Sequence, residues 1–255
     1  MALYLIGLGL SDEKDLSVKA LEAIKGCDII YLENYTSRLN VPPEKLEKLY
    51  SKKLILADRD MVESQAENTI LKDAKTKNVA FLVIGDIFSA TTHTDIWMRA
   101  RELGIKTILI HAAGIFSGIS ETGLQLYKFG KTTSIPFPTD KWKPETPYDI
   151  IKQNQKTDSH TLILLDLSPK EDRFMTVNDA LRYLLDIEAK RKEKVITDDT
   201  FCIGCARLGS DKPTIISGPI RKLLKADFGA PLHCLIVPGK LHFAEEKALG
   251  QWEKA

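Results

Sequence analysis

The chain has 255 residues, of which 44% are hydrophobic and 28% are charged. Such proportions are typical of a globular protein that folds as one large domain or two medium-sized ones. The formal net charge is +1, from 36 basic and 35 acidic residues. Because a nucleic-acid-binding protein usually carries a basic excess that replaces counterions along the phosphates, this balance disfavours a nucleic-acid partner. It favours a small-molecule or protein substrate.

Apolar runs such as 79–84 and 161–165 are far shorter than the roughly 20 residues that cross a bilayer as a helix. Met1 leads directly into an apolar segment, with no basic region before it and no cleavage-type segment after it. We therefore expect a cytoplasmic protein that does not span a membrane.

In the first half of the chain, short apolar runs alternate with amphipathic stretches. The expected strands are 3–8, 28–32, 53–56, 79–84 and 106–111, and the expected helices are 17–25, 63–75 and 92–103. The run 79–84 is apolar at consecutive positions, as expected for a strand covered on both faces. This alternation predicts parallel strands joined by right-handed helical crossovers.

The pattern restarts after the small residues Ala112, Ala113 and Gly114. Thr176 is a good helix N-cap, with Asp179 three residues later. A loop rich in proline is expected over 136–147. The remaining elements are expected helices at 115–126 and 176–190 and expected strands at 132–136, 161–165, 201–206, 214–217 and 233–237. We predict two consecutive α/β domains, residues 1–112 and 113–255.

Two loops that follow expected strands carry the residues of most chemical interest. The first, Gly7-Leu8-Gly9, lacks the third glycine of a dinucleotide fingerprint. The second begins with Gly85-Asp86 and continues through Ser89 to His93. In open α/β sheets ligands bind beyond the carboxyl ends of the strands, where a carboxylate can accept hydrogen bonds from a ribose or attract a cation. The alternative is that these are ordinary turn and cap residues.

These two loops, together with several other segments of the chain, resemble the diphthine synthases, a branch of the tetrapyrrole methylase superfamily. The similarity extends over almost the whole chain, in order, and the length is that of the archaeal type. The sequences Ala-Thr-Thr-His at 90–93 and Leu-Tyr-Lys-Phe-Gly-Lys at 126–131 are the segments specific to this branch. The matching segments are 3–10, 85–93, 123–131, 175–176, 197–200, 206–210 and 233–242.

The resemblance implies two unlike α/β domains, a homodimer, and S-adenosylmethionine bound in the cleft between the domains. The residues that it implies as cofactor contacts are Leu10, Asp86, Ser89, Gly114, Ile115, Leu165, Leu208 and His233. The chain departs from the family pattern at two places. Ile87 stands where the family usually has proline, and Ala113-Gly114 stands where it commonly has proline-serine.

The resemblance also implies the substrate, the modified histidine of translation elongation factor 2. Its 3-amino-3-carboxypropyl arm carries an amino group that is methylated successively to give diphthine. An amine attacks only when neutral, so a nearby base should help, and His93 and His111 are the candidates. The sequence leaves open how many methyl groups are added. The segment Lys141-Trp142-Lys143 is a candidate contact for the protein substrate.

Three other functions are compatible with parts of the sequence. The nearest alternative is a methyltransferase of the same superfamily that acts on a tetrapyrrole or on RNA. A non-catalytic binding module with the same fold is another. Tyr127 and Lys131 have the spacing of the catalytic pair of short-chain dehydrogenases, but Gly130 interrupts the helix that this pair requires, and no dinucleotide fingerprint is present.

Cys202 and Cys205 have the spacing of a redox or zinc motif. They lie in an apolar run that predicts a strand, where residues three apart face opposite sides. We therefore expect buried structural cysteines and no metal site. The four cysteines are too scattered for a disulfide framework in a chain of this length.

Overall fold

The computed structural model describes residues 1–139 and 141–252 of the chain. They form two compact units, Met1–Gly118 and Ile119–Ala255. Each unit contains a five-stranded sheet with helices, so the predicted fold of two consecutive α/β domains is confirmed. The first unit extends beyond the expected boundary at residue 112 because the short helix α6 (Ile115–Gly118) belongs to it. Gly118 of this helix lies against the Leu10 side chain.

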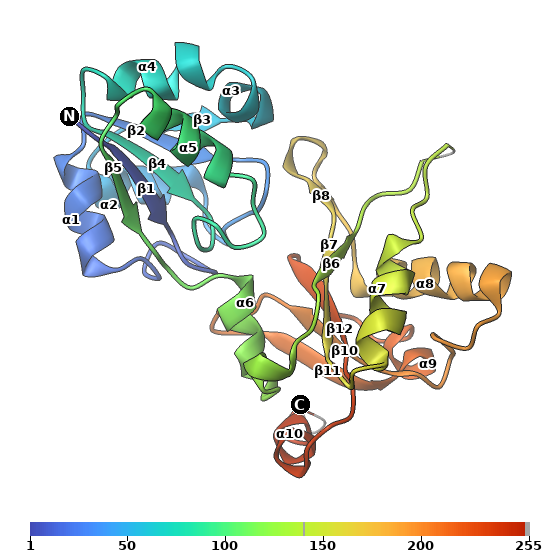
Figure 1. Ribbon diagram of the computed structural model, residues 1–255. Helices are drawn as coiled ribbons and strands as arrows, with labels where there is room; N and C mark the ends of the chain where they lie inside the picture. Colours follow the sequence, from blue (N-terminus) through green and yellow to red (C-terminus); the bar gives the residue numbers. More distant parts are fainter. Residues whose placement is uncertain (140, 253–255) are drawn as a thin grey trace. The chain divides into compact units, whose positions relative to one another are not determined.

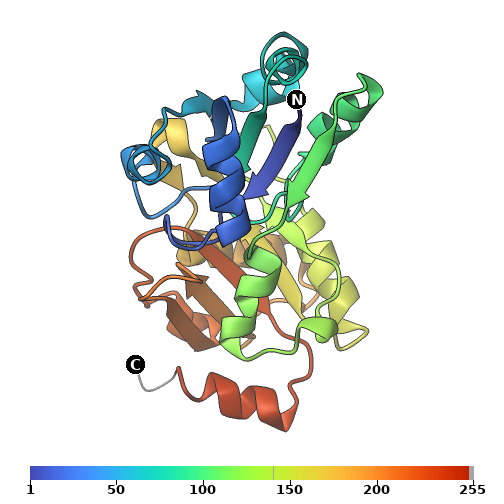
Figure 2. The ribbon, with the colours of Figure 1, turned by 90° about the vertical axis from the view of Figure 1, so that its left-hand side faces the viewer.

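The first unit has a parallel sheet with strand order β3-β2-β4-β1-β5. Its strands are β1 (Leu3–Gly7), β2 (Ile29–Glu33), β3 (Ile55–Ala57), β4 (Val79–Val83) and β5 (Thr107–Ile110). Its longer helices are α1 (Val18–Gly26), α2 (Pro43–Tyr50), α3 (Arg59–Glu63), α4 (Ile70–Ala74) and α5 (Thr94–Glu102). Figure 2 shows β1, in dark blue, between β4 and β5.

Alternate side chains of these strands face two separate cores, as the pleat of a strand requires. Leu5 and Phe81 pack with α3, α4 and α5 on one face, and Leu82 and Ile110 pack with α1 and α2 on the other (Figure 1). All five residues of β4 are buried, as predicted for a central strand covered on both faces. The carboxyl ends of β4, β1 and β5 are consequently neighbours at one edge of the sheet.

The second unit has the strand order β11-β10-β12-β7-β6. Its strands are β6 (Thr133–Ile135), β7 (Thr161–Leu165), β10 (Phe201–Ala206), β11 (Thr214–Pro219) and β12 (His233–Val237), and β8 (Leu167–Ser168) pairs with β9 (Arg173–Phe174) in a small hairpin. Its helices are α7 (Thr146–Gln155), α8 (Val177–Arg191), α9 (Ile220–Leu223) and α10 (Phe243–Leu249), with short 3₁₀ turns η2 (Ile119–Thr122), η3 (Leu126–Lys128) and η4 (Pro169–Glu171). Helix α8 begins as predicted, with a capping box between Thr176 and Asp179.

The prediction of parallel strands is correct for the first unit and wrong for the second. There only β6 and β7 run parallel, while β7, β12, β10 and β11 pair antiparallel. Successive strands in this unit are not all separated by helices long enough to cross over the sheet. The short connections between β10 and β11 permit an antiparallel return instead.

Two expected helices are broken. The segment 63–75 contains α3, a 3₁₀ turn η1 (Ala66–Asn68) and α4, because the backbone of Thr69 leaves the helical region and its hydroxyl donates to the Gln65 carbonyl at 2.7 Å. The segment 115–126 is α6 followed by η2, which ends where Gly123 adopts a φ of 81°. Helices α2 and α7 were not predicted. Proline lies in the first turn of each, where no hydrogen-bond donor is needed.

Helices long and apolar enough to span a bilayer are absent from the described residues.

A buried carboxylate ties the C-terminal helix to the rest of the second unit. Glu245 of α10 is fully buried and accepts hydrogen bonds from the N–H groups of Gln125 and His242, from the Lys128 ammonium and from Nε2 of His160. Burial opposes its ionisation, but these donors together lower the pKa of Glu245 to about 2.

The partners of His160 fix its tautomer. Its Nδ1 accepts the Gly239 N–H at 3.0 Å, so the ring proton is on Nε2, which donates to Glu245 at 3.0 Å. Burial lowers the pKa of His160, which favours the same neutral form. The Phe129 ring meets the His160 ring edge-on, with 5.2 Å between centroids, and Lys128 is paired with Glu245. Both residues therefore help to hold α10 in place.

The first prediction concerns this carboxylate. Glu245→Gln keeps the shape but presents an amide where four donors need acceptors, so we expect the free energy of unfolding at neutral pH to fall by about 3 kcal/mol. The folded pKa lies below the ordinary value of 4.5, so the wild-type contribution is present above about pH 4.5 and is lost as the pH falls toward about 2. The difference between variant and wild type should therefore narrow in acid.

Urea denaturation followed by circular dichroism at neutral and acidic pH measures this difference. The matched control is Glu246→Gln, the same change at an exposed neighbour. Equal stability of the Glu245 variant and this control at neutral pH would contradict the prediction.

Candidate functional site

The three adjacent strand ends of the first unit approach one another closely. A Cβ atom on Gly7 would lie 2.7 Å from the Gly85 carbonyl oxygen and 2.9 Å from Cβ of Ala112, so only glycine fits at the end of β1. Just beyond, Gly9 and Gly85 form a bridge in which the Gly85 N–H donates to the Gly9 carbonyl at 2.8 Å. The loops after β1, β4 and β5 are thereby fixed side by side.

Asp86 lies at the centre of this strand edge. Its Oδ1 accepts the Phe88 N–H at 3.2 Å and the Ser89 hydroxyl at 3.3 Å. Its Oδ2 accepts the Ala112 N–H at 3.3 Å and lies 2.8 Å from Nδ1 of His111. A carboxylate offers about four lone-pair positions, and all of them are used here.

The electrostatics of Asp86 favour a negative charge at this edge. Partial burial disfavours ionisation, but the hydrogen bonds from His111, Phe88 and Ala112 outweigh it, and the pKa of Asp86 lies below its ordinary value. The carboxylate is therefore ionised at neutral pH. It can attract a cation by its charge while its hydrogen bonds hold the loop from β4 against the loop from β5.

His111 follows β5 and is the exposed member of this pair. Because Nδ1 lies against an ionised carboxylate, it carries the ring proton and donates it to Asp86. Nε2 is then unprotonated in the neutral ring, and 61% of the side chain is exposed. His111 thus presents a proton acceptor to solvent or to a ligand, oriented by a carboxylate behind it.

The remaining predicted residues of the first unit lie in the same strand-edge loops. A Cβ on Gly114 would lie 3.0 Å from Cβ of Asp86 and 3.1 Å from Cβ of Ser89, so the start of α6 lies directly against the Asp86 loop. Ile115 is the first residue of that helix, and Leu10 packs on its last residue, Gly118. The structure therefore brings together all five cofactor contacts predicted for this unit.

The second unit collects its three predicted contacts at one edge of its own sheet. Leu165 ends β7, Leu208 follows the end of β10, and His233 begins β12. Since β12 runs antiparallel to both neighbours, the start of β12 and the ends of β7 and β10 lie at the same edge. Leu165 is half-buried and Leu208 is 7% exposed, so both present apolar surface there.

The His233 ring is fully engaged in structural hydrogen bonds. Nδ1 accepts the Val177 N–H at 3.3 Å, and Nε2 donates toward the carbonyls of Gly229 and Ala230 at 3.1 and 3.2 Å. Burial lowers the pKa of His233, in keeping with a neutral ring. A ligand contact by His233 would therefore use its backbone.

His93, the other base candidate, has a different environment. It is 1% exposed and lies edge-on against Phe81 and Tyr35, with ring centroids 5.3 and 6.1 Å apart. Burial lowers the pKa of His93 to about 4, so the ring is neutral. Of the two candidates, only His111 is both oriented and accessible.

Two residues of these strand edges were missed by the sequence reasoning. Glu33 ends β2, is fully buried and accepts the N–H groups of Tyr35 and Thr36; burial raises its pKa. A charged residue at the end of an apolar run was the available signal, as it was for Asp86.

Arg207 donates to the carbonyls of Phe228 and Ala230 and so holds the turn before His233. No sequence pattern indicates that role.

The cysteine motif forms a strand, as expected. Cys202 and Cys205 lie in β10 and are fully buried, and burial raises the pKa of Cys202 to about 12. Cys205 pairs across the ladder with Cys234. Thiols in this setting act as small apolar side chains rather than as nucleophiles or metal ligands.

Comparison with known proteins agrees with this architecture. Residues 2–224 match the family model of the tetrapyrrole (corrin/porphyrin) methylases. A diphthine methyl ester synthase from Dictyostelium discoideum is 50% identical, over 97% of this chain and 96% of that protein. A diphthine synthase from Methanococcus maripaludis strain C5 is also 50% identical, over 97% of both chains. A crystal structure of diphthine synthase superimposes with a TM-score of 0.91 at 36% identity, covering 100% of this chain and 97% of the other.

The second prediction tests the close approach of the strand ends. Gly7→Ala forces a Cβ against the Gly85 carbonyl and Ala112, and the backbone must shift, so we expect a loss of about 1–3 kcal/mol in the free energy of unfolding. Gly26→Ala is the matched control, because a Cβ there meets nothing within 4 Å. Thermal denaturation of both variants is the measurement, and equal melting temperatures would refute the prediction.

Proposed function

Because the chain belongs to the tetrapyrrole methylases and, among them, to the diphthine synthases, we propose that it methylates translation elongation factor 2 in diphthamide biosynthesis. The donor is S-adenosylmethionine. The acceptor is the amino group of the 3-amino-3-carboxypropyl arm on the modified histidine, which is methylated successively to diphthine. The observation that carries the proposal is the ionised Asp86 beside an accessible His111 at a glycine-lined strand edge.

The residues present fit such a donor. The first unit offers a negative charge at Asp86 for a cationic sulfonium and backbone groups at Gly114 and Ile115. The half-buried Leu165 and the nearly buried Leu208 have apolar side chains suited to the faces of an adenine ring. We assign donor contacts to Leu10, Asp86, Ser89, Gly114, Ile115, Leu165, Leu208 and His233.

A bound S-adenosylmethionine supplies a methyl group already activated by its positive sulfur, so the protein has to position the acceptor and remove a proton. The acceptor amine attacks with its lone pair and must therefore be neutral. We assign to Nε2 of His111 the acceptance of the amine proton. Asp86 stabilises the positive ring that results and keeps Nε2 oriented outward.

The protein substrate requires an outer contact surface, for which we retain Lys141-Trp142-Lys143. Trp142 is 55% exposed, while Lys143 is paired with Asp186 at 2.8 Å. The proposal includes a homodimer, as the family resemblance implies, and a cytoplasmic location.

A methyl-transfer assay tests the function itself. The protein is incubated with donor labelled in its methyl group and, in separate reactions, with elongation factor 2 carrying the aminocarboxypropyl histidine, with a precorrin and with RNA. We expect label only in the modified elongation factor. Label in the precorrin or the RNA instead would establish the alternative function. A protein with no labelled product and no rise in melting temperature with S-adenosylhomocysteine would be a non-catalytic module.

The assignment of His111 has its own test. His111→Asn keeps an N–H donor for Asp86 but removes the proton acceptor, so kcat should fall by about 10²–10⁴, the usual contribution of a general base. The melting-temperature shift caused by S-adenosylhomocysteine should stay as in the wild type. A kcat within about twofold of wild type, at any pH at which both are folded, would remove His111 from the mechanism.

A further inference from the structure

A partly exposed aromatic ring lies beside the proposed base. The ring of Phe88, in the loop after β4, meets the His111 ring edge-on, with 6.2 Å between centroids. It also packs against Trp97 of α5, with 5.8 Å between centroids. Phe88 and Trp97 are only partly buried. The imidazole to which we assign proton acceptance therefore has an aromatic neighbour that a ligand can reach.

The position of the Phe88 ring is fixed through its backbone and its side chain. The Phe88 N–H donates to Oδ1 of Asp86 at 3.2 Å, and the same carboxylate orients His111 through Oδ2 at 2.8 Å. The Trp97 indole is itself held, because its Nε1–H donates to the Thr107 hydroxyl of β5 at 3.2 Å. Phe88 and His111 thus keep a defined geometry, as a recognition site requires.

Successive methylation changes what the acceptor nitrogen can offer to His111. In each transfer the nitrogen lone pair forms an N–C bond while the carbon–sulfur bond of the donor breaks, and the electron pair of that bond stays on sulfur. The nitrogen becomes positive and, while it still bears an N–H, returns to a neutral amine by giving a proton to Nε2 of His111. A neutral amine with two methyl groups has no N–H left. A hydrogen bond to His111 can therefore no longer position it for the third transfer.

An aromatic face is complementary to such a nitrogen. Cations bind ring faces within about 6 Å of the centroid, and quaternary ammonium ligands are commonly recognised by aromatic side chains. The Phe88 and His111 centroids are 6.2 Å apart, so a nitrogen placed about 3 Å from His111 on the side of Phe88 is within that range. One bound nitrogen can therefore be in reach of both rings.

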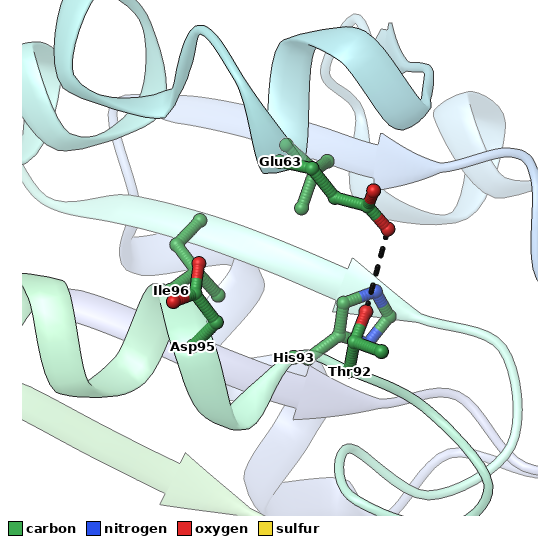
Figure 3. A pocket seen from close by; sticks show the side chains of 6 residues that line it. Glu63, Thr92, His93, Asp95 and Ile96 are labelled. Carbon is green, nitrogen blue, oxygen red and sulfur yellow. Dashed lines mark hydrogen bonds between the residues drawn. The ribbon is translucent and has the colours of Figure 1, made fainter.

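A hollow of about 270 Å³ between α3 and α5 is less suited to this nitrogen. Its lining includes Glu63, which accepts the Thr92 hydroxyl at 3.4 Å, and Asp95 (Figure 3). The acceptor carbon carries a carboxylate besides its amino group, and both acidic residues would repel that carboxylate. At His111, by contrast, the imidazole ring separates the acceptor from the Asp86 carboxylate that is bound to Nδ1.

We propose that Phe88 receives the methylated acceptor nitrogen on its ring face and so allows a single site to carry this nitrogen to a quaternary ammonium. This inference rests on the proposed function. Phe88 acts by contact with the methyl groups and His111 by proton transfer. The contribution of Phe88 therefore grows as the N–H groups are replaced, and the third transfer depends on it most.

The first measurement is of binding, so that it does not depend on turnover. Elongation factor 2 whose arm carries three methyl groups is titrated into the full-length protein saturated with S-adenosylhomocysteine, and calorimetry gives the affinity. Phe88→Leu keeps an apolar side chain but removes the aromatic face, and it should weaken this binding by about threefold to thirtyfold. Binding of the factor without the arm should stay as in the wild type.

Two further variants serve as controls. Phe88→Tyr retains the ring and should bind the trimethylated factor as the wild type does. Phe129→Leu makes the same change at a half-buried phenylalanine of the second unit whose ring also meets a histidine edge-on, and it should have no effect on binding.

The products of methyl transfer provide the second measurement. Mass spectrometry of the modified peptide counts the methyl groups at equal total methylation. We expect the wild type to accumulate the trimethylated nitrogen and Phe88→Leu to accumulate the forms with one and two methyl groups. A merely structural defect would slow all three transfers alike, so equal product ratios in the two proteins would overturn the inference.

The binding outcomes are distinct. If Phe88→Leu binds the trimethylated factor as tightly as the wild type, or if Phe88→Tyr binds it as weakly as Phe88→Leu, the ring face is not the contact and the inference is overturned. It is also overturned if Phe88→Leu loses the melting-temperature shift with S-adenosylhomocysteine, because the ring then serves the donor. If binding changes as expected but the wild type transfers no methyl group, the proposed function fails while the contact with the methylated nitrogen stands.

Discussion

The close packing of three parallel strand ends is the constraint on which the rest of the first unit depends. With β1 between β4 and β5, Gly7 contacts the chain after both neighbours, and there is no room for a side chain. The loops that leave the sheet are therefore near enough for one carboxylate to bind donors from two of them. Asp86 is in that position, and its four hydrogen bonds hold the loops after β4 and β5 together at this edge of the sheet. The loop that continues from Asp86 is held by successive hydrogen bonds as far as His93.

The surroundings of each histidine determine whether its ring is neutral and whether a ring nitrogen is accessible. His160 and His233 are neutral. Both ring nitrogens of His233 are bonded to backbone groups. In His160 one ring nitrogen accepts a backbone N–H and the other donates to the Glu245 carboxylate. Burial also keeps His93 neutral, with its ring packed edge-on against Phe81 and Tyr35. Among the described histidines, His111 alone combines a carboxylate partner with an exposed side chain. The proton acceptance that we propose is assigned to it for that reason, while the buried His160 and His233 hold neighbouring segments in place.

Much of this could be predicted from the sequence, because the strands are short apolar runs between polar segments and the helices between them predict the parallel pairing of the first unit. The strand-end position of Asp86 was predictable for the same reason. The predictions that failed had two causes, a local hydrogen bond and contacts between segments distant in sequence. The break at Thr69 comes from a local competition between its hydroxyl and the helix, and the antiparallel ladder of the second unit depends on which strand edges meet.

The two departures from the family pattern are consistent with this geometry. The hydrogen bond to Oδ1 of Asp86 comes from the N–H of Phe88, one residue after Ile87, so a residue at 87 is not required to donate to the carboxylate. Ile87 contributes its carbonyl to the Thr91 hydroxyl and a fully buried side chain to the core beneath the loop, and a proline could also provide a carbonyl and an apolar ring. At Gly114 a Cβ would lie 3.0 to 3.1 Å from Asp86 and Ser89, which is tight but can be relieved by a small shift. Serine there would press α6 slightly away from the carboxylate, whereas glycine lets the helix start directly against it. The chain thus preserves the bonds around Asp86 while changing the residues that flank them.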